Sequence, residues 1–328
     1  MIALWWTFGI AFGLVILVVG GLVLFAARTA RRVEQALPPL GRFIDIDGAR
    51  IHYLDEGDGP TLLLIHGLAG QMRNFTYALL DKLKRNYRVV ILDRPGNGYS
   101  GRARGSAAAI GAQAETILRF AKALKLERPL LVGHSLGGAV ALALASRDPH
   151  NVAGVALLAP VTRRPERVPA PFAGLQIRSP LVRRMVAWTL ATPLSIKNRE
   201  LVLTALFGPQ PVPADFAKRG GGLLNLRPSA FIGASTDLVA AHEDRADITA
   251  HYGELKVPVG VIYGTADRIL DPAAHIAALT ENLPGVEVEM IEGGGHMILI
   301  DSADRCAAFV ARMAQRAFSA DATLAPVA

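Results

Sequence analysis

Gly133-His134-Ser135-Leu136-Gly137 is the most informative stretch of this sequence of 328 residues. An apolar run at residues 129–132 leads into it, and a run of small and aliphatic residues at 138–143 follows it. In a G-x-S-x-G turn between a strand and a helix, the two glycines permit a sharp backbone that exposes the serine hydroxyl above a sheet, in front of the helix N-terminus. This context predicts that Ser135 is a nucleophile on such an elbow and not an ordinary turn serine.

Two downstream segments supply the other groups that a serine nucleophile needs. A serine hydroxyl reacts poorly at neutral pH unless a base takes its proton and a third group orients that base. Asp267 follows the predicted strand 257–263, and the predicted strand 286–291 runs into a glycine-rich turn that ends at His296. We therefore predict Ser135 as nucleophile, His296 as general base and Asp267 as the orienting carboxylate, with no metal or organic cofactor.

Other polar residues near these segments have simpler interpretations. Asp271 is the rival carboxylate, but Asp267 follows its strand more directly. His66 and His134 flank glycine turns, and we expect them to bond to the loop backbone. Asp301 is expected to be a helix N-cap or a solvated turn residue.

A second glycine-rich turn, His66-Gly67-Leu68-Ala69-Gly70, follows the predicted strand 62–65. Such a turn lets a backbone N–H point at the nucleophile. We predict that the N–H groups of Leu68 and Leu136 stabilise the oxyanion, at about 3–4 kcal/mol per donor. Gly67, Gly133 and Gly137 are then the glycines on which the site geometry depends.

From residue 43 onward the chain resembles the α/β-hydrolase fold serine hydrolases, in which nucleophile, acid and histidine follow in this order. Residues 42–57 resemble the opening hairpin, and Asp93-Arg94-Pro95-Gly96-Asn97-Gly98-Tyr99-Ser100 is similar to the D-x-x-G-x-G-x-S stretch after the next predicted strand, 89–92. The resemblance implies an α/β fold, with a mostly parallel eight-stranded sheet flanked by helices. Together with the apolar N-terminal segment described next, the chain resembles membrane-anchored monoacylglycerol lipases and bacterial lysophospholipase or esterase relatives.

The N-terminal segment is predicted to be a single-pass membrane anchor, residues 1–27. Residues 2–27 carry no charge. A helix of that length reaches roughly 39 Å, enough to cross a hydrocarbon core of about 30 Å with some tilt. Trp5 and Trp6 lie where an interfacial aromatic belt is expected. A cleaved signal peptide is the alternative, but no Lys or Arg precedes the apolar run, which is longer than usual for such a peptide.

The side of the membrane stays open between two alternatives. Arg28, Arg31 and Arg32 follow the apolar run directly, which favours a catalytic domain on the cytoplasmic side of a bacterial-type inner membrane. Membrane-anchored bacterial relatives also allow the periplasm. The single cysteine, Cys306, excludes an intrachain disulfide and so gives no marker of the compartment.

The chain is expected to form one α/β domain with an insertion, because strand patterns alternate with helical ones on either side of a long strand-free stretch. The predicted parts are a juxtamembrane helix and linker (28–42), a core in two pieces (43–160 and 256–318), a helical cap (161–255) and a flexible tail (319–328).

The cap is expected to set the choice of substrate. Its segments 181–194 and 199–207 are apolar enough to line an acyl-sized pocket, and a plain packing role is the equally consistent alternative. Residues 161–200 hold eight basic and two acidic side chains, in a chain whose formal net charge is +7. Beside a membrane anchor this charge predicts contact with anionic head groups, with a solvated basic face as the alternative. We expect no nucleic-acid partner, because stacking aromatics are not interleaved with the arginines.

The sequence thus predicts a membrane-anchored hydrolase of lipid-like esters, such as monoacylglycerols, lysophospholipids or phospholipids, that works through an acyl-enzyme. Two alternatives stay open: a C–C bond hydrolase or perhydrolase of the same fold, and a non-catalytic membrane-tethered scaffold. Besides the bilayer and the substrate, a second copy is a candidate partner, because Gly9 and Gly13 form a G-x-x-x-G that allows two membrane helices to approach closely.

Overall fold

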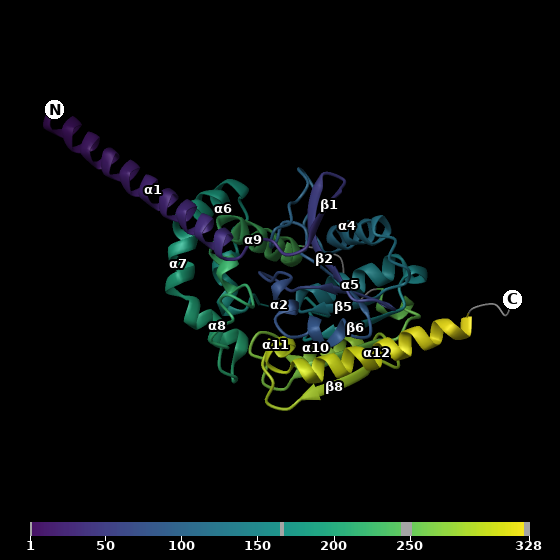
Figure 1. Cartoon of the computed structure of the whole chain (residues 1–328). Coiled ribbons are helices and arrows are strands. Elements are labelled where there is room, and N and C mark those ends of the chain that lie inside the picture. The colour runs from purple at the N-terminus through teal and green to yellow at the C-terminus, as the bar shows by residue number, and fades with distance from the viewer. Residues whose placement is uncertain (1, 165–166, 244–250, 325–328) are drawn as a thin grey trace.

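The computed structural model describes residues 2–164, 167–243 and 251–324 of the chain. Within these residues, eight strands form one sheet in the order β1-β2-β4-β3-β5-β6-β7-β8. Helices cover both faces of the sheet, further helices form a cap, and the long helix α1 (Ile2–Ala36) projects from the body (Figure 1). This arrangement confirms the fold class predicted from the sequence.

The sheet is antiparallel only at one end. Strand β2 runs antiparallel to both β1 and β4, and every other neighbouring pair is parallel. The strands are β1 (Arg42–Ile46), β2 (Ala49–Glu56), β3 (Thr61–Ile65), β4 (Arg88–Leu92), β5 (Leu130–His134), β6 (Gly154–Leu158), β7 (Val259–Gly264) and β8 (Glu287–Ile291). The carboxyl ends of β3, β5, β7 and β8 therefore meet at one edge, where ligands bind in open α/β sheets.

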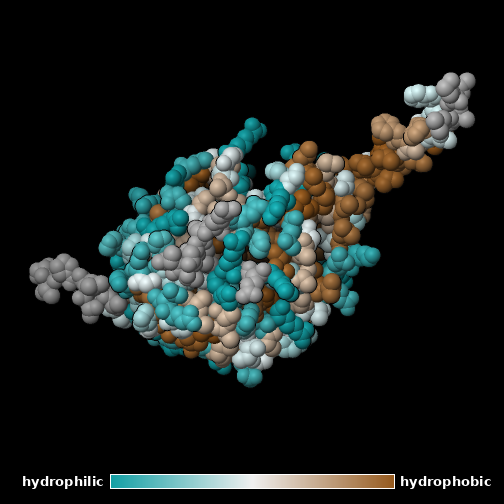
Figure 2. Space-filling model, turned by 180° about the vertical axis from the view of Figure 1, so that it is seen from behind, coloured by the Kyte–Doolittle hydropathy of each residue, from teal (hydrophilic) through white to brown (hydrophobic). Residues whose placement is uncertain are grey.

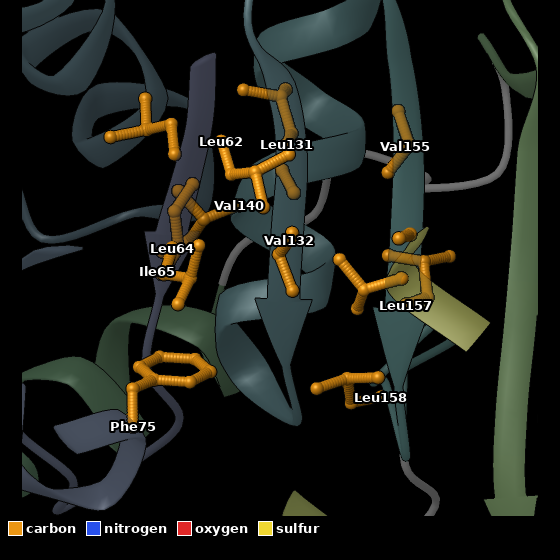
Figure 3. Packing of buried hydrophobic residues seen from close by; sticks show 14 of the residues in the cluster. Leu62, Leu64, Ile65, Phe75, Leu131, Val132, Val140, Val155, Leu157 and Leu158 are labelled. Atoms are coloured by element: carbon orange, nitrogen blue, oxygen red, sulfur yellow. The ribbon is translucent and has the colours of Figure 1, made fainter. Parts of the chain in front are cut away.

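The central strands are apolar on both faces because helices cover both. Every residue of β3, β5 and β6 is buried. Parallel strands covered on both sides have continuous aliphatic runs instead of an alternating pattern. Figure 3 shows the side chains of these three strands packed together, with Phe75 beside them. At the edge of the sheet, β8 alternates between more and less exposed residues.

Two helices flank β6 on opposite faces. Gly138 of α5 (Leu136–Arg147) lies against Leu157, whereas Ala317 of α12 (Ala303–Leu324) lies against Gly154. Positions 154 and 157 of one strand point to opposite faces. Helix α12 buries residues at helical spacing, namely Cys306, Phe309, Val310, Met313, Ala314 and Ala317. The other core helices are α2 (Arg73–Thr76), α3 (Leu80–Leu83), α4 (Ile110–Ala123), η1 (Pro149–Asn151), α10 (Pro272–Thr280) and α11 (Ile298–Asp301).

The C-terminal helix α12 extends into the segment for which a flexible tail is expected. A flexible tail was expected from residue 319, but α12 runs to Leu324. Its last residues include alanine and leucine, which favour helix. The rest of the predicted tail, residues 325–328, lies outside the described residues.

The described part of the predicted cap contains helices and irregular segments. Helices α6 (Pro180–Val186), η3 (Ala187–Ala191) and α7 (Thr192–Lys197) follow one another without a break, and η3 is a π-helical turn. The other cap elements are η2 (Ala170–Leu175), α8 (Arg199–Phe207), η4 (Gly222–Leu226), α9 (Pro228–Glu243) and η5 (Tyr252–Glu254).

Helix α1 joins the predicted anchor to the domain as one continuous helix. It is long and apolar enough to cross a membrane, and most of its apolar part is exposed. Near its C-terminal end, Val33 and Leu37 are buried against Leu224 of η4. The hydroxyl of Tyr99 donates to the carbonyl of Leu37 (2.5 Å), which fixes the chain as it leaves the helix.

Candidate active site

Ser135 lies on a strained turn between β5 and α5. Its φ of +53° and ψ of −123° place it in a region that non-glycine residues rarely adopt. A Cβ on Gly133 would lie 2.6 Å from the Cα of Gly138, and one on Gly137 would lie 2.1 Å from the carbonyl oxygen of Ile65. Both positions therefore require glycine, as expected for a sharp elbow between strand and helix.

Hydrogen bonds to the end of β6 hold the elbow in place. The N–H of Ser135 donates to the carbonyl of Leu158 (3.1 Å), and the carbonyl of Ser135 accepts from the N–H groups of Gly138 and Val161 (2.9 Å each). The strain at the serine is thus balanced by contacts with the neighbouring strand.

The structure brings Ser135, His296 and Asp267 together. His296 Nε2 lies 3.1 Å from Ser135 Oγ, and His296 Nδ1 lies 2.7 Å from Asp267 Oδ2. The three residues come from the carboxyl ends of β5, β8 and β7, although 161 positions separate the serine from the histidine. Both distances are within the reach required for proton transfer and for orienting a base.

The environment of Asp267 favours its ionised form. Burial opposes ionisation, but the nearby His296 and the N–H groups of Ile269 (2.8 Å) and Leu270 (3.0 Å) outweigh it and hold the pKa of the carboxyl below its usual value. The rival carboxylate, Asp271, instead caps α10 by accepting from two N–H groups of its first turn.

His66 and His134 bond to loop backbone, as expected. His66 Nδ1 lies 2.8 Å from the carbonyl of Gly67, and His134 Nε2 lies 3.2 Å from the carbonyl of His296. Burial, with Arg94 nearby, lowers the pKa of His66 to about 3. Burial, with His296 nearby, lowers the pKa of His134 to about 3 as well. Both rings are therefore neutral at physiological pH.

The two predicted oxyanion donors belong to residues next to the serine. Leu68 and Leu136 line the same pocket as Ser135. Leu136 is the first residue of α5, and the first N–H groups of a helix have no acceptor within it. A Cβ on Gly67 would lie 2.8 Å from the Cβ of Ser135, so the loop passes directly over the serine.

Asp301 differs from its prediction. It lies at the end of α11 and is half-buried, so it is neither a helix N-cap nor a solvated turn residue. Burial raises the pKa of its carboxyl.

Above Ser135 lies an apolar pocket of about 760 Å³, including its open mouth. Its wall contains residues from the β6–η2 connection, from η2 and α9 in the cap, and from the loops beneath, namely Leu68, Ile110, Leu136, Val161, Val168, Pro169, Phe172, Leu238, Ala241, Ile269 and Leu270. This apolar lining suits an apolar ligand.

The segments 181–194 and 199–207, expected either to line an acyl-sized pocket or only to pack, are not part of this wall. In the first segment the small residues Ala187 and Ala191 are buried, and the large apolar ones face outward. A helix with small residues on one side packs closely through that side, and here η3 contacts both α1 and α9.

The basic residues of the cap lie in three different surroundings. Arg164 and Arg167 line the pocket near His242. Arg183 is buried and donates to Ser235 Oγ (2.9 Å) and to the carbonyl of Ile177 (2.6 Å). Exposed basic side chains of the cap include Arg184, Lys197 and Arg199.

The predicted membrane-interface residues all lie on α1. Trp5 and Trp6 are exposed near its N-terminal end, where the helix projects from the body (Figure 1). Arg28, Arg31 and Arg32 are exposed on the part of α1 that lies beside the cap. The two tryptophans and the three arginines therefore lie at different positions along the axis of α1.

Several residues around the site were missed from the sequence. Gln210, after α8, bonds to both sides of the loop before His296, through the carbonyl of Gly293 (2.7 Å) and the N–H of Gly295 (3.1 Å). Arg94 and Asp237 form a buried ion pair (2.8 Å) between the core and the cap. No local pattern could have found these residues, because their partners lie 83 or more positions away.

No three histidine, cysteine or carboxylate side chains among the described residues are grouped so as to hold a metal ion.

Residues 62–309 match a family model described as the alpha/beta hydrolase family. The chain is 27% identical to Lipase 1 of Psychrobacter immobilis, over 79% of this chain and 79% of that protein. It is 40% identical to the dihydrolipoyllysine-residue acetyltransferase component of the acetoin cleaving system of Cupriavidus necator, but only over 37% of this chain. That match spans 32% of the length of the acetyltransferase component.

Among solved structures, the chain is similar to a membrane phospholipase A described as a bacterial virulence factor. The TM-score is 0.69 at 26% sequence identity, and the match covers 95% of this chain and 97% of that one. The match therefore covers nearly the whole length of both chains.

Proposed function

This chain belongs to the alpha/beta hydrolase family, and we propose that it is a membrane-anchored serine hydrolase of lipid-like carboxylic esters. The observation that carries the proposal is the row of hydrogen bonds from Asp267 through His296 to Ser135, at 2.7 and 3.1 Å, at the floor of an apolar pocket. A similar lipase and a similar membrane phospholipase A support the substrate class.

In the proposed mechanism, Ser135 Oγ attacks the ester carbonyl while His296 Nε2 takes the hydroxyl proton. Asp267 keeps the proton of the imidazole on Nδ1 and stabilises the imidazolium that forms. The N–H groups of Leu68 and Leu136 bind the oxyanion. His296 then returns the proton to the leaving alcohol, and water hydrolyses the acyl-enzyme by the same steps.

The pocket favours an acyl chain over a polar substrate. Its wall is aliphatic and aromatic around Ser135, with Arg164, Arg167 and His242 as its polar groups. An acyl chain in the apolar part would leave the polar end of the lipid near the two arginines. Monoacylglycerols, lysophospholipids and phospholipids all satisfy this arrangement.

Membrane attachment through α1 is part of the proposal. The helix is long and apolar enough to span a bilayer. Trp5 and Trp6 lie near one end of its uncharged stretch and Arg28 directly follows the other end, which are the positions expected at the two membrane interfaces. We place it in a bacterial-type inner membrane. The side that the domain faces, and the homodimer through Gly9 and Gly13, stay predictions.

The test is Ser135→Ala in the full-length protein, with Ser146→Ala on the same helix as the matched control. We expect Ser135→Ala to abolish hydrolysis of p-nitrophenyl esters and labelling by a fluorophosphonate, and Ser146→Ala to keep both. The unaltered protein should prefer medium or long acyl chains to acetate. Activity confined to a C–C bond, or no turnover and no labelling of the folded protein, would favour one of the two alternatives.

A further inference from the structure

Large apolar side chains of the cap are exposed along the rod formed by α6, η3 and α7. The rod buries its smaller or polar side, including Ala187, Ala191 and Thr192. The rod exposes seven large residues, which we call the cap face: Leu181, Val182, Met185, Trp188, Leu190, Leu194 and Ile196. A row of this kind is unusual on a surface that faces only water and marks a site of interaction.

The cap face adjoins the helix that we propose to cross the membrane. Helix α1 packs against η3 and η4, and its residues Val23, Leu24 and Phe25 are exposed just before that contact. Figure 2 shows the hydrophobic surface of the projecting helix continuing onto the neighbouring part of the body. The exposed apolar side chains of α1 and those of the cap face therefore form one continuous surface.

Exposed basic side chains accompany this surface. They are Arg28, Arg31 and Arg32 on α1, and Arg184, Lys197 and Arg199 on or next to the cap rod. Apolar residues on one side of a helix with Lys and Arg around them are typical of helices that lie in the plane of a membrane interface. The long stems of these basic residues let their charges reach the head groups.

We propose that the cap face lies in the interfacial layer of the bilayer that α1 crosses, at the point where α1 leaves it. This inference rests on the membrane attachment proposed above. Lipid is the occupant because the face is continuous with a membrane-spanning surface and because the adjacent positive charge matches anionic head groups. The domain is then held against the membrane by two contacts, which limits its rotation about α1.

The test compares two exposed methionines in full-length protein reconstituted in vesicles of phosphatidylglycerol and phosphatidylethanolamine. Met185 of the cap face is 61% exposed, and Met290 on β8, the matched control, is 38% exposed. Each is replaced by cysteine in a Cys306→Ala background and labelled with an environment-sensitive fluorophore. We expect lipids with a shallow nitroxide to quench the Met185→Cys label at least about threefold more than the Met290→Cys label.

Equal quenching at both positions would overturn the proposal. If neither label is quenched and energy transfer occurs between Met185→Cys labels on two copies, the cap face is a protein interface and the proposal is wrong. Neither readout requires catalysis, so the result is separate from the question of whether the protein hydrolyses esters. Vesicle flotation of the unlabelled protein tests the α1 attachment on its own.

A second, independent inference concerns the peptide that joins Gly67 to Leu68. The carbonyl of Gly67 accepts from Arg94 Nη2 (2.9 Å) and from His66 Nδ1 (2.8 Å). His66 Nε2 accepts from the N–H of Arg94 (2.9 Å), so the ring proton is on Nδ1. In a trans peptide the C=O and N–H point in opposite directions. Fixing this carbonyl therefore fixes the N–H of Leu68.

Arg94 connects this peptide to the cap. The side chain is fully buried, and its Nε also donates to the carbonyl of His66 (2.8 Å). Its Nη1 pairs with Asp237 of α9 (2.8 Å), which is fully buried as well and also pairs with Arg102 Nη2 (2.5 Å). The next residue of α9, Leu238, lines the pocket. One guanidinium thus joins the glycine-rich turn at residues 66–70, which we call the oxyanion loop, to the cap helix α9.

We infer that Arg94 is a positioning residue that holds the N–H of Leu68 for the transition state, with Asp237 holding the guanidinium in turn. The inference rests on the proposed function. A fork of several N–H donors can bond to two carbonyls and a carboxylate at once, which an ammonium cannot do with the same geometry. Lysine at position 94 would therefore keep the positive charge but would not hold the carbonyl of Gly67, and with it the N–H of Leu68, in the same orientation.

The test is Arg94→Lys, with Arg183→Lys as the matched control. Both arginines are buried and bonded to α9, but Arg183 does not contact the oxyanion loop. For p-nitrophenyl butyrate, we expect Arg94→Lys to lower kcat about tenfold or more with KM within about twofold, because the lost interaction acts in the transition state. Affinity for a trifluoromethyl ketone, which forms an oxyanion on the serine, should fall by a similar factor. Arg183→Lys should change neither.

Unchanged kcat and ketone affinity in Arg94→Lys, or equal losses in Arg183→Lys, would contradict the positioning role. If Arg94→Lys does not fold, Asp237→Asn gives the same test with the arginine in place, and we expect the same pattern. Ser135→Ala separates this result from the proposed function, because turnover that survives Ser135→Ala refutes the mechanism whatever Arg94 does.

Discussion

At the scale of single residues, Asp267 and Asp271 form a natural comparison because only one of them reaches His296. Asp267→Asn removes the acceptor that selects the Nδ1–H tautomer, and we expect kcat to fall about 10³–10⁴-fold. Asp271→Asn should keep kcat within about twofold and change stability by less than about 1 kcal/mol, since the asparagine side-chain oxygen still accepts from the first N–H groups of α10. Steady-state hydrolysis of p-nitrophenyl butyrate and thermal unfolding of both variants check this. Similar kcat values for the two variants would contradict the assignment.

The sequence was informative for residues whose role depends on a local motif. Ser135, Asp267 and His296 each follow a predicted strand, and parallel strands bring their carboxyl ends to one edge. The Arg94–Asp237 pair spans 143 positions and has no motif of its own. Asp301 was misjudged because its burial depends on how α11 packs, which no local pattern reveals.

At the scale of elements, the turn between β5 and α5 depends on glycine for space. A methyl group at position 137 would overlap the carbonyl of Ile65, so we expect Gly137→Ala to cost about 3 kcal/mol of unfolding free energy and most of the activity. Gly174→Ala is the control, because a Cβ there meets nothing within 4 Å. Urea unfolding followed by fluorescence measures both. A Gly137→Ala protein as stable as Gly174→Ala would contradict the geometry of the elbow.

The strands were predictable and the roles of the cap helices were not. Strands β3, β5 and β6 are short apolar runs that only a sheet covered on both faces explains. The rod of α6, η3 and α7 is also apolar, but which side is buried depends on α1, more than 140 positions earlier in the chain, and on α9, which follows it. Hydrophobicity alone therefore assigned its large residues to the pocket, whereas they face outward.

At the scale of the whole molecule, buried histidines make stability depend on pH. The pKa of His66 and of His134 is lowered to about 3, and that of His275 to about 4, in each case mainly by burial. As pH falls below about 6.5, the unfolded chain binds protons at these sites and the folded protein does not. Stability is thus fully present above pH 6.5 and is lost toward pH 4, by up to about 1.4 kcal/mol per pH unit for each histidine.

Urea unfolding of the full chain in detergent at pH 7, 5.5 and 4.5 measures this loss. His275→Gln, which removes one of the three histidines, should reduce the slope between pH 6.5 and 4 by at most about 1.4 kcal/mol per pH unit. A free energy of unfolding that is constant over this range would show that the rings are protonated in the folded state as well.

The most direct measurement of the central claim is the site of covalent modification. Full-length protein in vesicles is treated with a fluorophosphonate carrying a long alkyl chain, digested with trypsin and analysed by mass spectrometry with fragmentation. We expect one adduct, on Ser135 and not on Ser146 of the same helix, and none in the His296→Ala protein. An adduct on another residue, or ester hydrolysis that continues with Ser135 unmodified, would contradict the account.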